Sequence, residues 1–140
     1  MSDPTYALQI AMAAALLGDG VVSGFVGASV YDSVSAINQP YPMIEIGEDQ
    51  VMPKLLTEGD LIEVFSTVHV YADGHSGRLM AKQIAEAVTR VLEMPLSLTG
   101  YSMASSVLHQ TQHLTQADTT DQGQIAHSVL IFHFNIYATP

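Results

Sequence analysis

The chain has no cysteine and only four basic residues among its 140 positions. Without cysteine it can form no disulfide, no thiolate metal site and no cysteine nucleophile. Fourteen acidic residues leave it with a formal charge of −10. So few cations cannot neutralise phosphates over a broad surface, which disfavours direct binding of DNA or RNA and docking on anionic lipid. The same charge is compatible with an acidic wall past which DNA slides without adhering.

Sequence motifs of catalysis are also absent. The chain contains no Gly-rich phosphate loop, no Gly-x-Ser-x-Gly elbow and no His-Glu-x-x-His metal motif. Most acidic residues fall in predicted loops, so no pair of catalytic carboxylates can be placed. We therefore expect neither an enzyme nor a cofactor.

Two of the six histidines have a spacing that suits a metal ion on a helix. His109 and His113 are four residues apart, but the alternation around them predicts a strand, on which their side chains stand about 13 Å apart. One metal ion cannot bridge that distance, and we expect no metal. The alternative is a small ligand-binding or metal-binding α+β domain that combines one of them with His127 or His133 from a neighbouring strand.

An apolar segment, residues 7–17, opens the predicted fold. Asp3 as N-cap and Pro4 at the first helical position predict a helix that ends at the glycines of residues 18–20. No basic residue precedes it, unlike a signal peptide, and it is shorter than the ~20 residues of a membrane span. Because the helix is apolar on almost every side, we expect burial on more than one side, by loops of its own chain or by another subunit.

The rest of the chain predicts strands around a second helix. Alternating apolar residues and proline-enforced extension predict strands over residues 28–31, 43–46, 61–71, 106–115 and 124–137. Ser76 as N-cap and Pro95 beyond the end predict the helix, which runs to about Glu93. Residues 48–60 contain four acids, a proline and a glycine, and predict a loop of about a dozen residues. Residues 116–123 predict a hairpin turn, because Asp118 and Asp121 lack the ligand series of a calcium loop.

These elements predict one domain over residues 1–140, of the α+β class. We expect an antiparallel β-sheet of about four to five strands with two α-helices packed on one face. Both faces of the last strand are substantially apolar, which predicts a central strand that is covered on both sides or by a partner.

The second helix carries three of the four basic residues on one face. Arg78, Lys82, Glu86 and Arg90 recur every four residues. One interpretation is a solvated face with ion pairs between successive turns, each of which contributes a few tenths of a kcal/mol. The other is an inter-subunit stripe of Arg78, Lys82 and Arg90 that docks an acidic neighbour in an assembly.

The order of several short motifs resembles the phage tail completion, or tail terminator, family, including the tail terminators of gene transfer agents. The matching pieces follow an N-terminal helix and cover nearly the whole chain: Val26-Gly27-x-x-Val30-Tyr31-Asp32, Pro40-Tyr41-Pro42-Met43-Ile44-x-Ile46-Gly47, the strand that ends near Tyr71, Gly77-x-x-x-Ala81-x-x-Ile84, Leu96-x-Leu98-x-Gly100, and the closing strand after Asp121-x-Gly123. The chain departs from the family at His109, Gln112 and His113, where basic residues are usual.

The resemblance implies a structural virion protein, assembled in the bacterial cytoplasm. Such proteins form a homo-oligomeric ring, typically of six subunits, at the head-proximal end of the tail tube, where they end tube polymerisation and join the tail to the neck or head. The implied partners are the major tail tube protein and a neck or head-completion protein, with no membrane. DNA would pass through the lumen without specific binding, and we expect much of the acidic charge to face it. Another neck or minor tail protein is the alternative.

On this reading the acidic segment of residues 48–60 is expected to contact the tube or the neck. The contact residues that we expect are Glu48, Asp49, Gln50, Met52, Lys54, Glu58 and Asp60.

Overall fold

The computed structural model describes residues 3–32, 41–56, 59–73, 76–117 and 124–138. In chain order the elements are α1 (Thr5–Gly18), α2 (Gly20–Val26), β1 (Val30–Tyr31), β2 (Met43–Leu56), β3 (Gly59–Asp73), α3 (Gly77–Leu92), β4 (Tyr101–Ala117) and β5 (Gln124–Ala138). The strands form one five-stranded sheet in the order β1-β2-β3-β5-β4. The predicted α+β class is therefore confirmed.

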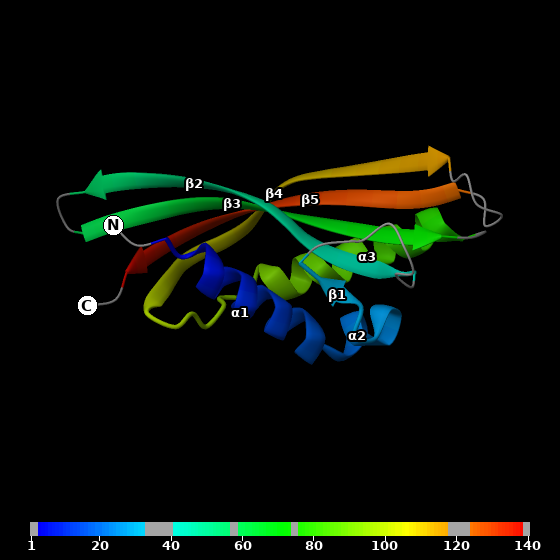
Figure 1. The fold of residues 1–140 in the computed structure, drawn as a ribbon, viewed down its shortest axis with the longest axis horizontal. Helices are drawn as coiled ribbons and strands as arrows, with labels where there is room; N and C mark the ends of the chain where they lie inside the picture. Colours follow the sequence, from blue (N-terminus) through cyan, green and yellow to red (C-terminus); the bar gives the residue numbers. More distant parts are fainter. Residues whose placement is uncertain (1–2, 33–40, 57–58, 74–75, 118–123, 139–140) are drawn as a thin grey trace.

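The helices lie on one face of the sheet, and no described helix or strand covers the other face (Figure 1). Neighbouring strands pair antiparallel except β1, which pairs parallel with β2. The hairpins β2–β3 and β4–β5 reach toward opposite ends of the molecule (Figure 1). β5 lies between β3 and β4, as predicted for a central strand, but its second face is open in the described residues.

The hydrophobic core lies between the sheet and the helices. One face of β5 is fully buried, through the predicted residues Leu130, Phe132, Phe134 and Ile136. α3 supplies a matching apolar stripe with Ala81, Ile84, Val88, Val91 and Leu92. Burial of this apolar area is the main stabilising term of the fold, at about 25 cal/mol per Å² removed from water.

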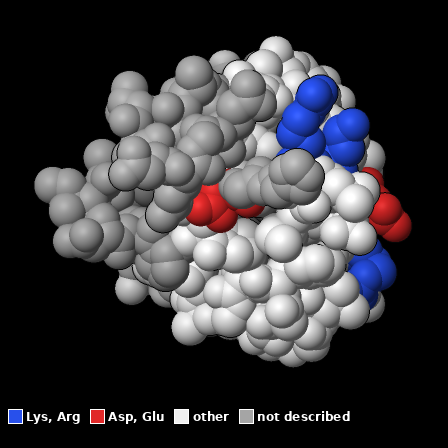
Figure 2. Space-filling view, turned by 90° about the vertical axis from the view of Figure 1, so that its right-hand side faces the viewer, with Lys and Arg blue, Asp and Glu red and all other residues white. Residues whose placement is uncertain are grey.

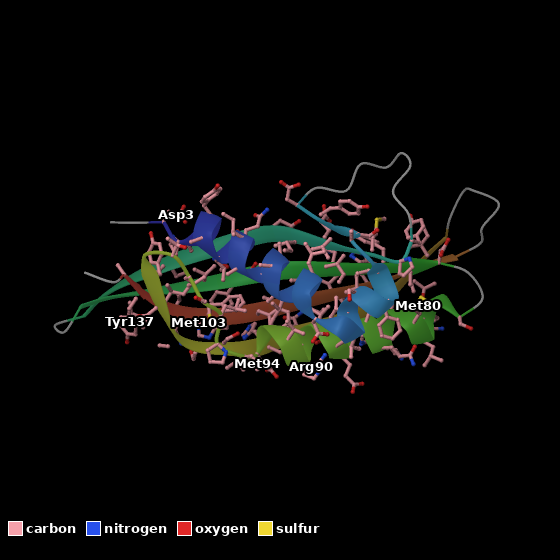
Figure 3. All side chains as sticks on the ribbon, turned by 90° about the horizontal axis from the view of Figure 1, so that it is seen from below. Asp3, Met80, Arg90, Met94, Met103 and Tyr137 are labelled. Carbon is pink, nitrogen blue, oxygen red and sulfur yellow. The ribbon has the colours of Figure 1, made fainter. Side chains whose placement is uncertain are left out.

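α1 packs beside α3 over the sheet and runs in the opposite direction (Figure 3). Leu8, Met12 and Leu16 form its buried stripe. The predicted cap is displaced by one residue: the helix begins at Thr5, and the Asp3 carboxylate accepts hydrogen bonds from both the backbone N–H and the hydroxyl of Thr5.

The glycine-punctuated segment after α1 contains a helix that the sequence pattern did not predict. Asp19 ends α1 and caps α2, because its carboxylate accepts the backbone N–H groups of Val21 and Val22 at 3.1 and 3.0 Å. Val22 is fully buried. The cap and this burial override the low helix propensity of Gly20 and Gly24.

The prediction of a loop over residues 48–60 is wrong, because most of this segment belongs to the β2–β3 hairpin. β2 pairs with β3 from Met43 to Leu56, with one register shift between Ile46 and Asp49. Acidic residues and Pro53 made the segment resemble a loop. An outer strand of a sheet tolerates both, since its outward backbone groups need no partner strand.

No single helix in the described residues is long and apolar enough to span a membrane. α1 and α2 meet the length and composition test only as a pair, bent by 84° at the break between them.

Candidate assembly surfaces

The outer face of α1 is an apolar surface that the described residues leave open. It consists of Tyr6, Ile10, Ala14 and Leu17, and the first two side chains are 79% and 52% exposed. A groove of about 500 Å³ runs beside it toward Tyr101 at the start of β4. Burial on more than one side was predicted for this helix, but within the described residues the chain covers only the stripe that faces the core.

The basic residues of α3 lie on the solvent side of the helix, where Lys and Arg side chains gather on one flank of the molecule (Figure 2). Arg90 donates to Asp19 at 2.9 Å and so links α3 to the cap of α2. The pKa of the Asp19 carboxyl is lowered, mainly by the hydrogen bond from the N–H of Val22 and further by the contact with Arg90. Arg78 and Lys82 form no ion pair with any described residue.

Two adjoining grooves separate α3 from β4. The larger, of about 520 Å³, extends from Lys82 toward Glu93, and the smaller, of about 210 Å³, lies between Arg78 and Thr115. His113 lines both and contacts the Ser128 hydroxyl at 2.7 Å. Burial and the neighbouring Lys82 charge lower the pKa of His113. The smaller groove is thus lined by two cations and no acidic residue, whereas Glu86 and Glu93 also line the larger one.

The open face of the sheet holds a histidine pair. Nδ1 of His69 lies 2.8 Å from Nε2 of His127, and Nε2 of His69 lies 3.4 Å from the Glu48 carboxylate. The ring of Tyr71 stacks on His127 with centroids 4.4 Å apart, and its hydroxyl donates to Glu45 at 3.4 Å. Burial and the Glu45 charge raise the pKa of Tyr71 to about 12, so this hydroxyl stays protonated.

Burial and the neighbouring His69 also lower the pKa of His127. The contact between two neutral rings needs one N–H and one lone pair, so protonation of both rings would abolish it. The histidine pair is thus a polar network on an otherwise partly apolar surface.

A second group on the open face surrounds Phe65. His133 stacks on the Phe65 ring with centroids 4.7 Å apart and contacts Glu63 at 3.1 Å, while His109 meets the ring edge-on at 5.1 Å. A β-bulge between Leu108 and Gln110 turns His109 toward this face, whereas His113 faces the helices. In the described part of the chain no three His, Asp or Glu side chains converge as metal ligands.

The residues expected to contact the tube or neck are divided between the two faces of the β2–β3 hairpin. Glu48 reaches His69 on the open face, while Asp49 is paired in register with the buried Ser66 and so lies on the helix side. Gln50 and Met52 are exposed on the open face. For the rest of the set, the structure gives strand positions to Lys54 in β2 and Asp60 in β3, whereas Glu58 lies outside the described residues.

Residues 10–137 match the model of a protein family that is described as "Tail completion protein gp17". The chain belongs to this family. The resemblance inferred from the order of the motifs is thereby confirmed, and this tail completion protein is a structural component of the tail of a phage-like virion. No curated protein matches the chain.

A solved structure shares the fold over its full length. It is a chain from a structure titled "Virion of native gene transfer agent (GTA) particle", with a TM-score of 0.80 and 22% identity, and the match covers 99% of this chain and 100% of that chain. The arrangement of five strands and covering helices is therefore one that a virion component also adopts.

Sequence reasoning missed the histidine pair of this tail completion protein. His69 and His127 are far apart in the sequence and meet because the register of β3 with β5 places Tyr71 opposite His127. The only signal was that each histidine interrupts an apolar strand. That signal does not identify the partner strand or its register.

Proposed function

We propose that this tail completion protein forms a homo-oligomeric ring, of six subunits, that ends the tail tube and joins it to the neck or head. The observation that carries the proposal is the family match over residues 10–137. A closed ring requires one heterologous contact, repeated between different surfaces of neighbouring subunits. The protein offers several open surfaces for such contacts.

The outer face of α1 is proposed as a surface that becomes covered on assembly. Exposed apolar side chains arranged contiguously are a mark of interaction sites on soluble proteins. Tyr6 and Ile10 contribute most of this area, and the groove toward Tyr101 offers a recess for a side chain of a partner. A standard interface buries about 800 Å² on each partner, so this face would be part of an interface rather than the whole.

The β2–β3 hairpin is proposed as the arm that contacts the tube protein or the neck protein. It reaches one end of the molecule, and Glu48, Gln50 and Met52 are exposed along it. The net charge of −10 per subunit further favours a lumen that repels DNA, because a ring multiplies this charge around a narrow channel. A neutral or basic lumen in the assembled ring would contradict this part of the proposal.

The role is tested by deleting the gene in a strain that produces the particles. We expect tails of uncontrolled length and heads without joined tails in negative-stain electron microscopy, with restoration by the intact gene. Normal tail length with unjoined heads would instead identify another neck protein. Normal, joined particles would refute the proposal. Native mass spectrometry of the purified protein measures the number of subunits directly.

The arm is tested by side-chain substitutions rather than by deletion. Residues 50–56 are paired with β3 throughout, so removing them would destroy half of a strand. We expect Glu48→Lys with Met52→Ser to leave the protein folded but to prevent joining or length control. Leu79→Ser, which changes a 62% exposed residue on α3, is the matched control. Loss of function in the control but not in the arm variant would refute the assignment.

A further inference from the structure

The sheet ends in an edge strand that lacks the usual protection against pairing. β4 is the last strand in the order, and it contains neither a charged residue nor a proline over its 17 residues. Protein edges are normally blunted by charges, proline, bulges or short length, because their outward N–H and C=O groups can template another strand. β4 has two bulges, but the second lies at Leu108/Gln110, and the strand is regular beyond it.

Among the described residues, contacts from the end of α3 reach only the first half of this edge. The Glu93 carboxylate accepts the backbone N–H of Leu108 at 2.9 Å, and the Ser106 hydroxyl donates to the Leu92 carbonyl at the end of α3. From Gln110 to Ala117 the described residues supply no backbone hydrogen bond on the outer side of β4. We call residues 110–117 the open edge.

The surroundings of the open edge define the strand that it would accept. Arg78 and Lys82 stand beside it on the helix side, form no ion pair with described residues, and line the groove that ends at Thr115. A strand added here would extend the floor of this groove, so its helix-side side chains would meet these two cations. Charge complementarity therefore selects an extended segment with a carboxylate on its helix side.

We propose that the open edge of one subunit pairs with the outer edge of β2 in the next subunit, which makes one continuous sheet around the ring. This inference rests on the ring of the proposed function. β2 lies at the opposite side of the sheet from β4, and β1 covers only its positions Ile44 and Glu45 within the described residues. Pairing of opposite edges is heterologous, which is the kind of contact that closes a ring.

The faces of the two strands are matched for this contact. A continuous sheet keeps the helix sides of both subunits on the same face, so Asp49, on the helix side of β2, would lie toward Arg78 and Lys82 of the neighbouring subunit. Pairing of β2 with another β2 would instead bring Glu48 and Asp49 together with their own copies. Like charges thus disfavour the wrong pairing while opposite charges favour the right one.

Site-directed crosslinking tests the contact, and the absence of native cysteine removes background reactions. Purified Asp49→Cys protein is mixed with Thr111→Cys protein and treated with a short bismaleimide. We expect a crosslinked dimer only in the mixture, and a ladder up to the ring size when both substitutions are in one chain. Gln112→Cys is the matched control, because the neighbouring residue points to the opposite face. Crosslinking of Asp49→Cys to itself, or equally to residues 111 and 112, would overturn the proposal.

A charge exchange gives a second, independent readout. We expect Arg78→Glu with Lys82→Glu to abolish both crosslinking and the ring while thermal unfolding is unchanged. Adding Asp49→Lys to the same chain, which then keeps no cysteine at position 49, should restore the ring. Native mass spectrometry shows whether the natural protein and the exchanged variants form the ring. If all of them form it equally and no crosslink appears, the contact is overturned but the proposed function still stands. Normal particles without the gene would refute the proposed function itself.

Discussion

The histidine pair makes the stability of the protein depend on pH in a direction that the structure determines. The side chain of His127 is 9% exposed, lies 2.8 Å from His69 through Nε2, and has no described hydrogen-bond partner at Nδ1. Its pKa is lowered by burial and by His69, against the opposing charges of Glu45 and Glu48. The folded protein therefore binds a proton at this site more weakly than the unfolded chain.

The sign and size of the effect follow from proton linkage. Above the unfolded pKa of about 6.5, both states are neutral at His127 and the site contributes no pH dependence. Below it, the unfolded chain takes up a proton that the folded protein resists, so the free energy of unfolding falls as the pH falls. One such site gives at most about 1.4 kcal/mol per pH unit. In a domain of this size, a loss of about 1 kcal/mol lowers the midpoint of thermal unfolding by roughly 4 °C.

The assay is thermal unfolding followed by circular dichroism between pH 8 and pH 5.5. We expect the midpoint to be level down to about pH 7 and then to fall by several degrees. The range stops at pH 5.5 because burial raises the pKa of Asp49, which would stabilise the folded state at lower pH. His127→Gln should flatten the curve, and His113→Gln separates the contribution of the other histidine with a lowered pKa. An unchanged slope in His127→Gln would refute the reasoning, as would a midpoint independent of pH in the natural chain.

Three further predictions follow from the core, the outer face of α1 and the histidine pair. Phe132→Ala should cost about 3–5 kcal/mol in urea unfolding, because the side chain is fully buried beneath the helices. Ile10→Ser with Leu17→Ser should lower the unfolding free energy of the monomer by no more than about 1 kcal/mol, about 0.5 kcal/mol for each surface substitution, but reduce ring formation in size-exclusion chromatography with light scattering. Gly47→Ala should weaken the pH dependence, since its Cβ would lie 2.9 Å from Cδ2 of His69 and displace that ring. A full pH slope in this variant would contradict the assignment.

The parts of the fold that the sequence predicted are those with uninterrupted local patterns. From Ser128 to Tyr137, β5 alternates strictly between buried and half-buried residues, and α3 carries its apolar stripe at helical spacing up to the stop at Pro95. The apolar sides of both elements are covered by residues of the same chain. The environment in the fold is therefore the one that the local pattern predicts.

The elements that sequence reasoning missed are those where tertiary context prevails over local preference. α2 is glycine-rich and short, and the Asp19 cap and the burial of Val22 and Val26 stabilise it. β2 is acidic and contains Pro53, which an edge position permits. The open edge could not be recognised before the strand order was known, because nothing in the composition of β4 shows which strand lies at the end of the sheet.

Both ends of the described chain lie at one pole of the molecule. Asp3 and Tyr137 are at the same end as the last residues of β2 (Figures 1 and 3), whereas the last residues of β4 are at the far end. A small protein fused ahead of Asp3 or beyond Tyr137 would therefore mark the same side of an assembled particle. Electron micrographs of two such fusions would read the polarity of the subunit along the tail axis, and would tell which hairpin points toward the head.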